Sequence, residues 1–194
     1  MSTQLARKIN LPEKGNSAFL ANVDQLKATL KWSDATDLDL VAIYVRNDDT
    51  CGMISFVDKG NLNLFPFIMS SGDAGVGDKV DTSAGNEESM VITKIDPSIK
   101  AIYLLAWDYE AARNSRAARF TKDLKLSILS VSGQESDTFE ATLALSDSGH
   151  NGVAVSVIEK GAIGYQYKNL SKGFTLYDLD PVNILTSIGI TAKK

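Results

Sequence analysis

Gln25-Leu26-Lys27-Ala28-Thr29-Leu30-Lys31-Trp32 alternates between polar and apolar side chains along its whole length. Successive side chains of a β-strand point to opposite faces of a sheet, so this alternation predicts a strand with one face in a core and the other in water. Residues 138–145 repeat the pattern, with Phe139, Ala141, Leu143 and Leu145 on one face. These two segments favour an all-β fold.

Further strand candidates surround these two segments. They are rich in β-branched and aromatic residues and end at clusters of Gly, Asp, Asn and Ser, as strands usually do: residues 40–46, 53–57, 90–95, 101–107, 124–131, 153–159 and 163–168. Strands spaced by about 10 to 15 residues leave too little chain for regular crossover helices. The expected fold is therefore an antiparallel β-sandwich.

Two segments break this pattern. Asp180 followed by Pro181 is typical of a helix start, and Val182, Leu185 and Ile188 then follow at spacings of three, which predicts a short C-terminal helix. Residues 109–120, YEAARNSRAARF, are rich in alanine and arginine. They predict either a helical turn or a basic loop between two strands.

The composition is that of an ordinary globular protein. The 194 residues are 44% hydrophobic and 23% charged, which predicts a single domain over residues 1–194 with its core at about 22–190. No run of eighteen apolar residues occurs, and the first twenty residues contain no apolar core of a signal peptide. We therefore expect no transmembrane segment and a cytoplasmic location. Cys51 has no second cysteine with which to form an internal disulfide.

Negative charge is concentrated in two stretches. Residues 33–39 carry −3 and residues 71–89 carry −4, so the rest of a chain with net charge −4 is positive by 3. A focused negative potential favours a cation as partner and disfavours DNA or RNA at these loops.

The chemistry of these stretches is that of a calcium site. Calcium takes six to eight oxygen ligands, and residues 72–89 combine carboxylates and amides with glycines that permit tight turns. Asp37 and Asp39 alternate around Leu38, so both carboxylates would leave one face as the chain enters a core strand. The spacing does not fit an EF-hand loop. A polar loop that merely faces solvent is the alternative that composition leaves open.

No catalytic constellation is visible. The chain has one histidine, His150, in an expected hairpin turn where it would be solvated, and no Gly-x-Ser-x-Gly motif, so neither a serine nor a cysteine triad can be assembled. The three glycines of residues 72–77 lack the Lys-Ser/Thr ending of a phosphate-binding loop. We expect no enzyme and no organic cofactor.

A basic stripe is the remaining feature. Arg113, Arg116 and Arg119 are spaced by three and could meet a phosphate, an anionic membrane surface or an acidic partner. The alternative is a solvated face.

A set of short motifs is spread over about residues 26–173. The motifs are Trp32, Asp37-Leu38-Asp39, Gly77-Asp78, Gly85-Asn86-Glu87-Glu88-Ser89, Trp107-Asp108, Glu159-Lys160-Gly161-Ala162 and Tyr165-Gln166-Tyr167. In these motifs the chain resembles the TerD-like family of tellurite-resistance and stress proteins. The resemblance implies a β-sandwich with closely spaced calcium sites, formed by the Asp-Leu-Asp segment and an acidic, glycine-rich loop that ends in Glu-Ser.

Carried over position by position, the resemblance nominates as calcium ligands Asp37, Asp39, Asp78, Asn86, Glu87 and Glu88. Charge and neighbourhood alone add Asp73 and Asp81. The sequence departs from the family pattern in residues 80–84, which are poorer in Gly and Asp, and at Asn86, which stands where a carboxylate is usual. These departures imply a lower affinity or the loss of one of two sites.

Two functions follow as expectations. The first is a calcium-binding, non-enzymatic regulatory or stress-response module of the tellurite-resistance type, in which the ion orders the acidic loops. The alternative is a scaffold or assembly subunit whose acidic loops form a docking surface with weak or absent calcium binding. Both imply a protein partner that the sequence does not name.

Overall fold

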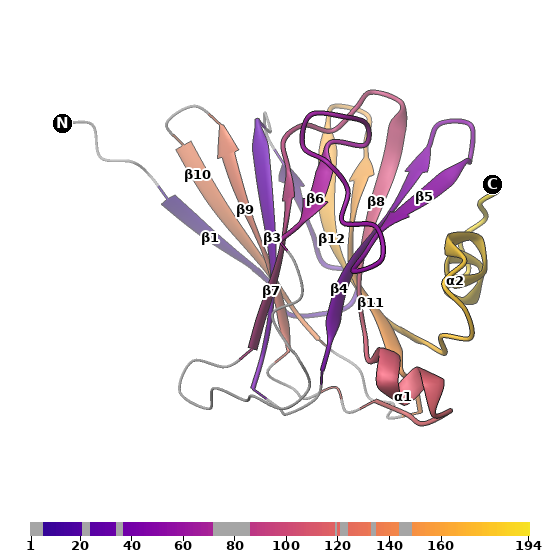
Figure 1. Cartoon of the computed structure of the whole chain (residues 1–194). Helices are drawn as coiled ribbons and strands as arrows, with labels where there is room; N and C mark the ends of the chain where they lie inside the picture. Colours follow the sequence, from indigo (N-terminus) through magenta and orange to yellow (C-terminus); the bar gives the residue numbers. More distant parts are fainter. Residues whose placement is uncertain are drawn as a thin grey trace.

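The chain folds into two six-stranded β-sheets that face each other (Figure 1). The structure, a computed structural model, describes residues 6–20, 24–33, 37–71, 86–118, 120, 124–132, 135–143 and 149–194. The first sheet has the order β1 (Ala6–Leu11), β10 (Glu135–Thr142), β9 (Lys125–Ser132), β3 (Gln25–Trp32), β7 (Asn86–Ile92) and β6 (Ile68–Ser70). The second has the order β2 (Ser17–Leu20), β12 (Tyr165–Phe174), β11 (Gly152–Lys160), β8 (Ile99–Trp107), β4 (Asp39–Arg46) and β5 (Cys51–Ile54).

The predicted all-β sandwich is confirmed. Neighbouring strands pair antiparallel, except that β1 runs parallel to β10. The bounds of β3 are those that its alternation predicts, and its four apolar side chains are buried while the polar ones face outward. They pack in the core between the sheets against residues such as Leu40 and Ile102 of the second sheet. Burial of each such leucine or isoleucine contributes about 1.5–3 kcal/mol.

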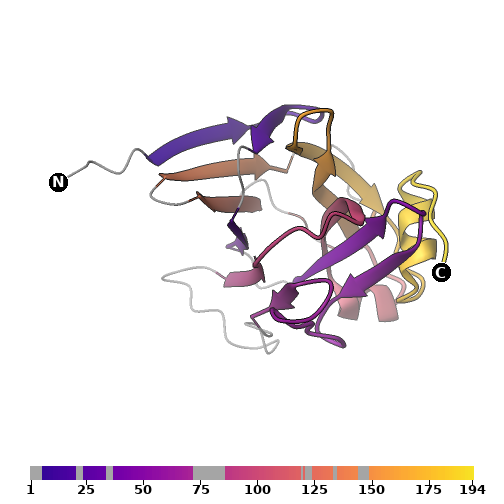
Figure 2. The same cartoon turned by 90° about the horizontal axis from the view of Figure 1, so that it is seen from above.

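The two sheets differ on their outer faces. The outer face of the second sheet carries a second apolar cluster, in which Val41 and Ile43 pack with Ile184, Leu185 and Ile188. These last three residues belong to or adjoin helix α2 (Pro181–Ser187), which lies beside that sheet in both views (Figure 2). Strand β4 is consequently buried on both faces over most of its length.

Three strands were not predicted, and each is an edge strand or is very short. β1 and β6 form the two edges of the first sheet, and β2 forms one edge of the second. β2 has four residues and β6 has three, which is too short for a periodic pattern. Elsewhere the strand ends shift: β5 ends at Ile54 and leaves Val57 exposed, and β7 begins at Asn86 instead of Met90.

The predicted C-terminal helix is confirmed, and the first of the two outcomes for residues 109–120 occurs as helix α1 (Tyr109–Arg113). Each helix is capped by an aspartate: Asp108 accepts a hydrogen bond from the N–H of Ala111 at 2.7 Å, and Asp180 accepts one from Val182 at 2.9 Å. An N-cap acceptor satisfies an N–H that the helix itself cannot.

Two further features of the described residues concern membrane spans and the single cysteine. Among the described residues, no helix has the length and apolarity needed to cross a membrane. Cys51 lies half-buried in the edge strand β5, where burial, and then the nearby Asp180, raises the pKa of its thiol. A raised pKa disfavours the reactive thiolate.

Candidate metal centre

Strands β4 and β7 begin at the same end of the sandwich (Figure 1). At that end the carboxylate of Glu88 lies on the inner face of β7, between the two sheets. Glu88 shares the inner face of β7 with Met90 and is 6% exposed. Its Oε2 atom accepts a hydrogen bond from the backbone N–H of Leu40 in β4. A buried hydrogen bond thus joins the two acidic stretches, which lie about fifty positions apart in the sequence.

Asp39 is the first residue of β4, and its side chain lies on the outer face of the second sheet. It pairs directly with Trp107 of β8, so both side chains share a face of the second sheet, and Trp107 belongs to the outer apolar cluster. The indole Nε1–H of Trp107 donates to Oδ2 of Asp39 at 3.1 Å. Because Trp107 is fully buried, this hydrogen bond holds the half-buried carboxylate of Asp39 in one place.

Asp37 directly precedes Leu38, which is buried in the core. Leu38, between the two aspartates, is 1% exposed and packs in the core between the sheets. Asp37 is half-buried, as is Asn86, which pairs with Trp32 at the start of β7. The backbone that carries both aspartates is therefore fixed by an apolar contact.

Glu87 does not join this group. Side chains alternate along β7, so Glu87 lies on the outer, exposed face of the first sheet while Glu88 lies on the inner face. Lys31 on the neighbouring strand pairs with it, Nζ to Oε2, at 2.8 Å. β7 begins earlier than predicted, so Glu87 and Glu88 are adjacent residues of one strand and point to opposite faces. They are therefore not placed to bind the same ion.

The remaining nominees Asp73, Asp78 and Asp81 lie in residues 72–85, outside the described residues. The described residues on either side of that stretch are hydrogen-bonded to each other: the N–H and Oγ–H of Ser71 both donate to the carbonyl oxygen of Ser89, at 2.9 and 2.8 Å. Oγ of Ser89 donates in turn to Oγ of Ser71 at 3.0 Å. These bonds fix where the acidic stretch leaves and re-enters the sheet, directly beside Glu88.

The described residues by themselves do not complete a metal site. No group of three or more histidine, cysteine, aspartate or glutamate side chains that could hold an ion occurs among them. The backbone hydrogen bonds and the strand register bring Asp39, Glu88 and Asn86 to one end of the sandwich. Calcium needs six to eight oxygens, so further ligands would have to come from outside this set.

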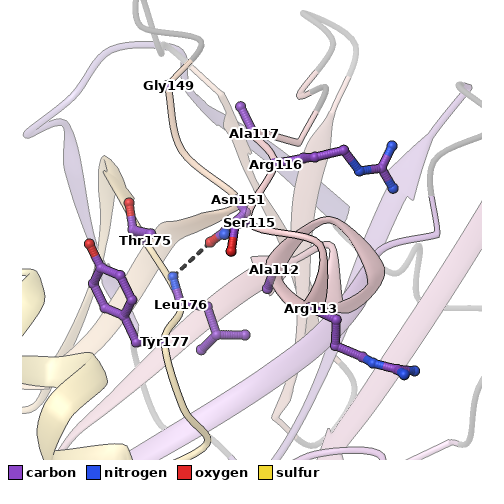
Figure 3. A pocket seen from close by; sticks show the side chains of 10 residues that line it. All are labelled: Ala112, Arg113, Ser115, Arg116, Ala117, Gly149, Asn151, Thr175, Leu176 and Tyr177. Atoms are coloured by element: carbon purple, nitrogen blue, oxygen red, sulfur yellow. Dashed lines mark hydrogen bonds between the residues drawn. The ribbon is translucent and has the colours of Figure 1, made fainter.

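A second candidate site was not predicted as a cavity. A pocket of about 500 Å³ lies between α1 and the segment that follows β12 (Figure 3). We call it the α1 groove and define it by Arg113, Ser115, Arg116, Asn151, Thr175 and Tyr177. The arginine spacing was the only signal in the sequence. It is not a helical stripe, because α1 ends at Arg113, and Arg119 lies outside the described residues.

The histidine is packed, contrary to the expectation of a solvated turn residue. His150 is half-buried, and its ring lies over Gly173, where an added Cβ would come within 2.1 Å of the ring Cδ2 atom. Only a glycine fits beneath the ring. Its neighbour Asn151 is 3% exposed and forms the floor of the α1 groove.

The fold is matched by solved structures at low sequence identity. A homologue of the telluride resistance protein TerD from Streptomyces coelicolor A3(2) superposes with a TM-score of 0.56 and 17% identity, over 88% of this chain and 99% of that one. This chain has the fold of that TerD homologue. A protein of unknown function, SAV2460, matches with a TM-score of 0.50 and 15% identity, over 78% of this chain and 92% of that one.

The resemblance to TerD-like proteins is thereby confirmed at the level of the fold. No protein-family model matches the chain, and no curated protein matches its sequence. At 15–17% identity, the likeness to the TerD homologue and to SAV2460 establishes the architecture and carries no ligand with it.

Proposed function

We propose that the chain is a calcium-binding β-sandwich module of the regulatory or stress-response type, without catalytic activity of its own. The observation that carries this proposal is the position of Glu88. Its carboxylate is almost fully buried and accepts a hydrogen bond from the N–H of Leu40, the residue that follows Asp39 in β4. A buried carboxylate is costly unless hydrogen-bonded donors or a cation offset its lost hydration.

The arrangement fits two neighbouring cation positions better than one. Asp39 lies on the outer face of the second sheet and Glu88 between the sheets, so the two carboxylates flank the start of β4. One ion on each side would use both carboxylates, and the acidic residues 72–85, which lie in the chain between the hydrogen-bonded Ser71 and Ser89, would supply the remaining oxygens. Ion binding would then order that stretch and prepare a surface for a protein partner in the cytoplasm.

The fold supports the cellular role only in part. One solved protein with this fold is described as a homologue of a telluride resistance protein. We extend that role to this chain as part of the proposal, and we assign it no direct chemistry with tellurite.

The scaffold function is the second candidate, and one observation favours it. Lys31 pairs with Glu87 on the exposed outer face of the first sheet, so this carboxylate has a cationic partner without a bound ion. In a scaffold, the acidic end would be a charged docking surface that binds calcium weakly or not at all.

Calorimetric titration with calcium separates the two candidates, and adjacent residues supply matched variants. Glu88→Gln keeps the shape and an acceptor for Leu40 but removes the buried charge, so it should weaken calcium binding by at least about tenfold. Glu87→Gln removes one charge from the exposed outer face and should change the affinity by less than about threefold. Magnesium should compete poorly and zinc should not bind preferentially, because the donors are all oxygens.

The scaffold function predicts no saturable heat in the wild type. Saturable binding that both variants weaken equally would mean that the charge of the loops, and not the position of Glu88, attracts the ion. That result would contradict the proposed site.

A further inference from the structure

The α1 groove carries an inference that is independent of calcium. Its walls come from distant parts of the chain: α1 and the turn after it on one side, and Thr175 to Tyr177 on the other (Figure 3). A smaller pocket of about 180 Å³ shares Ala112, Arg113, Leu176 and Tyr177 with it, so the two pockets adjoin each other. Pockets of a few hundred Å³ are the size that small organic ligands occupy.

A buried donor faces this groove. The Oδ1 atom of Asn151 accepts a hydrogen bond from the N–H of Leu176 at 2.7 Å, and this bond fixes which end of the amide points toward the backbone (Figure 3). The Nδ2 group is left as a two-hydrogen donor that makes no hydrogen bond within the described part of the chain. Asn151 is 3% exposed and lines the groove, so water or a ligand in the groove can accept from this donor.

The turn after α1 adds a hydroxyl at an unusual backbone position. The N–H of Ser115 donates to Ala112 at 3.0 Å and that of Arg116 donates to Ala111 at 2.8 Å, a helix ending in which the Ser115 position is usually glycine. Ser115 has φ = 52°, in the left-handed region that disfavours side chains. The turn places its hydroxyl and the following Arg116 along the groove.

The other polar groups of the groove are also donors. Thr175 and Tyr177 carry hydroxyls and lie on the wall opposite α1, and Tyr177 is 88% exposed. Arg113 and Arg116 are exposed at the rim, and their guanidinium groups extend away from Tyr177 in Figure 3. Rotation about their side-chain torsions would bring them over a ligand.

These groups select for an anion with many acceptor sites. One amide, three hydroxyls and two guanidinium groups offer more donors than the two oxygens of a carboxylate can use. A phosphate group has three strongly accepting oxygens and close to two negative charges at neutral pH. The groove volume and the exposed ring of Tyr177 leave room for an organic group that stacks on the ring.

We propose that the α1 groove binds a phosphate monoester of a small organic molecule. The phosphate would lie against Asn151 and Ser115, and the two arginines would close over it. Glu110 competes for one of them, because its Oε1 lies 3.7 Å from a guanidinium nitrogen of Arg116.

The test is titration with phenyl phosphate, followed by amide chemical shifts and calorimetry in the presence of EDTA. Because EDTA removes calcium, this titration does not depend on the proposed calcium site. An absence of phenyl phosphate binding would not count against the proposed function, and an absence of calcium binding would not count against this groove. The expected result is saturable binding with shifts centred on residues 112–117, 151 and 175–177. Inorganic phosphate should bind the same residues more weakly, since it lacks the stacking group.

Three substitutions sharpen the assignment. Arg113→Gln should weaken binding by about tenfold, because it removes a charge-assisted contact. Glu110→Gln should tighten it by about twofold, because it releases Arg116 from an exposed ion pair. Asn151→Asp keeps an acceptor for Leu176 but sets a negative charge on the floor, so it should abolish binding, with a melting curve to verify that the variant is folded.

Lys27→Gln is the control, since Lys27 is an exposed cation on the first sheet, away from the groove. It should leave the affinity unchanged. Absence of saturable binding by the wild type, or an equal loss in Arg113→Gln and Lys27→Gln, would overturn the proposal.

Discussion

Two regions of opposite charge lie at the same end of this sandwich and are built in different ways. At the acidic end, carboxylates are fixed on strands by neutral donors: the backbone of Leu40 holds Glu88, and the indole of Trp107 holds Asp39. In the α1 groove, the charged groups are an exposed arginine on the one-turn helix α1 and another in the turn after it, and the fixed donor is the neutral amide of Asn151. Asp108, between Trp107 and α1, connects the two regions.

The difference indicates how substitutions in each region should affect folding stability and ligand affinity. Strand carboxylates held by buried donors are positioned before an ion arrives, so their replacement should cost folding stability as well as affinity. Exposed arginines adapt to a ligand and should contribute little to stability. Substitutions at the acidic end should therefore be the more damaging ones.

The largest effect is expected at Glu88. Glu88→Ala leaves the N–H of Leu40 without this acceptor in the core, which should lower the free energy of unfolding by about 2–3 kcal/mol. Glu88→Gln keeps an acceptor and should lose about 1 kcal/mol or less in chelator. Urea denaturation of both variants measures the difference, and equal losses would show that the hydrogen bond to Leu40 does not matter.

Trp107→Phe should have a smaller effect. It removes the donor to Asp39 but keeps most of the buried ring, so unfolding should require about 1–2 kcal/mol less. In the background of Asp39→Asn the same substitution should cost less, because the charge-assisted part of the hydrogen bond is already absent. Additive losses in this double-mutant cycle would contradict a role of Trp107 in positioning Asp39.

Asp108 should respond to pH. Burial raises the pKa of Asp108, although its hydrogen bond from Ala111 acts in the opposite direction. The protonated form is therefore favoured on folding, and the stability contributed by Asp108 is complete below its unfolded-state pKa and is lost as the pH rises through the folded-state value.

Asp108→Asn keeps the N-cap acceptor without the charge, so at pH 7 it should equal or exceed the wild type in stability, and this advantage should vanish at about pH 3. Asp108→Ala should lose about 1 kcal/mol at pH 7. Thermal unfolding at both pH values checks these expectations. An Asn variant less stable than the wild type at pH 7 would contradict the stated effect of burial.

The smallest effect concerns the two helix ends. α2 ends in the same turn as α1, but with Gly189 at the left-handed position, at φ = 78°, where α1 has Ser115. Ser115→Gly should stabilise the fold by up to about 1 kcal/mol, and Gly189→Ala should destabilise it by about the same amount. If Ser115→Gly also weakens phenyl phosphate binding, the hydroxyl serves the groove at a cost in stability. Unchanged binding would remove Ser115 from the site.

Much of the fold was predictable because burial on one face of a strand leaves a period of two. β3 shows this most clearly, and Asp180 with Pro181 marked α2 through the chemistry of helix caps. β1, β2 and β6 were missed because edge strands need few apolar residues and pair largely through the backbone. Parallel pairing of β1 with β10 depends on contacts between residues about 130 positions apart.

The candidate sites were predictable to different degrees. Charge concentration located the acidic end, but the division of Glu87 and Glu88 between two faces depended on how far β7 extends. The α1 groove is formed by α1, Asn151 and Tyr177, which are far apart in the chain. No local sequence pattern predicts that they come together.

The most direct test of the central claim is the melting temperature of three proteins, the wild type, Glu88→Gln and Glu87→Gln, each in millimolar calcium and in chelator. Calcium at about 100 times Kd adds about 2.7 kcal/mol per site, which corresponds to about 5–10 °C in a domain of this size. The account predicts that calcium raises the melting temperature of the wild type and of Glu87→Gln by at least this amount, and that Glu88→Gln loses the part of the increase that comes from the ion between the sheets. Equal melting curves for the wild type in calcium and in chelator would contradict the account and favour the scaffold function.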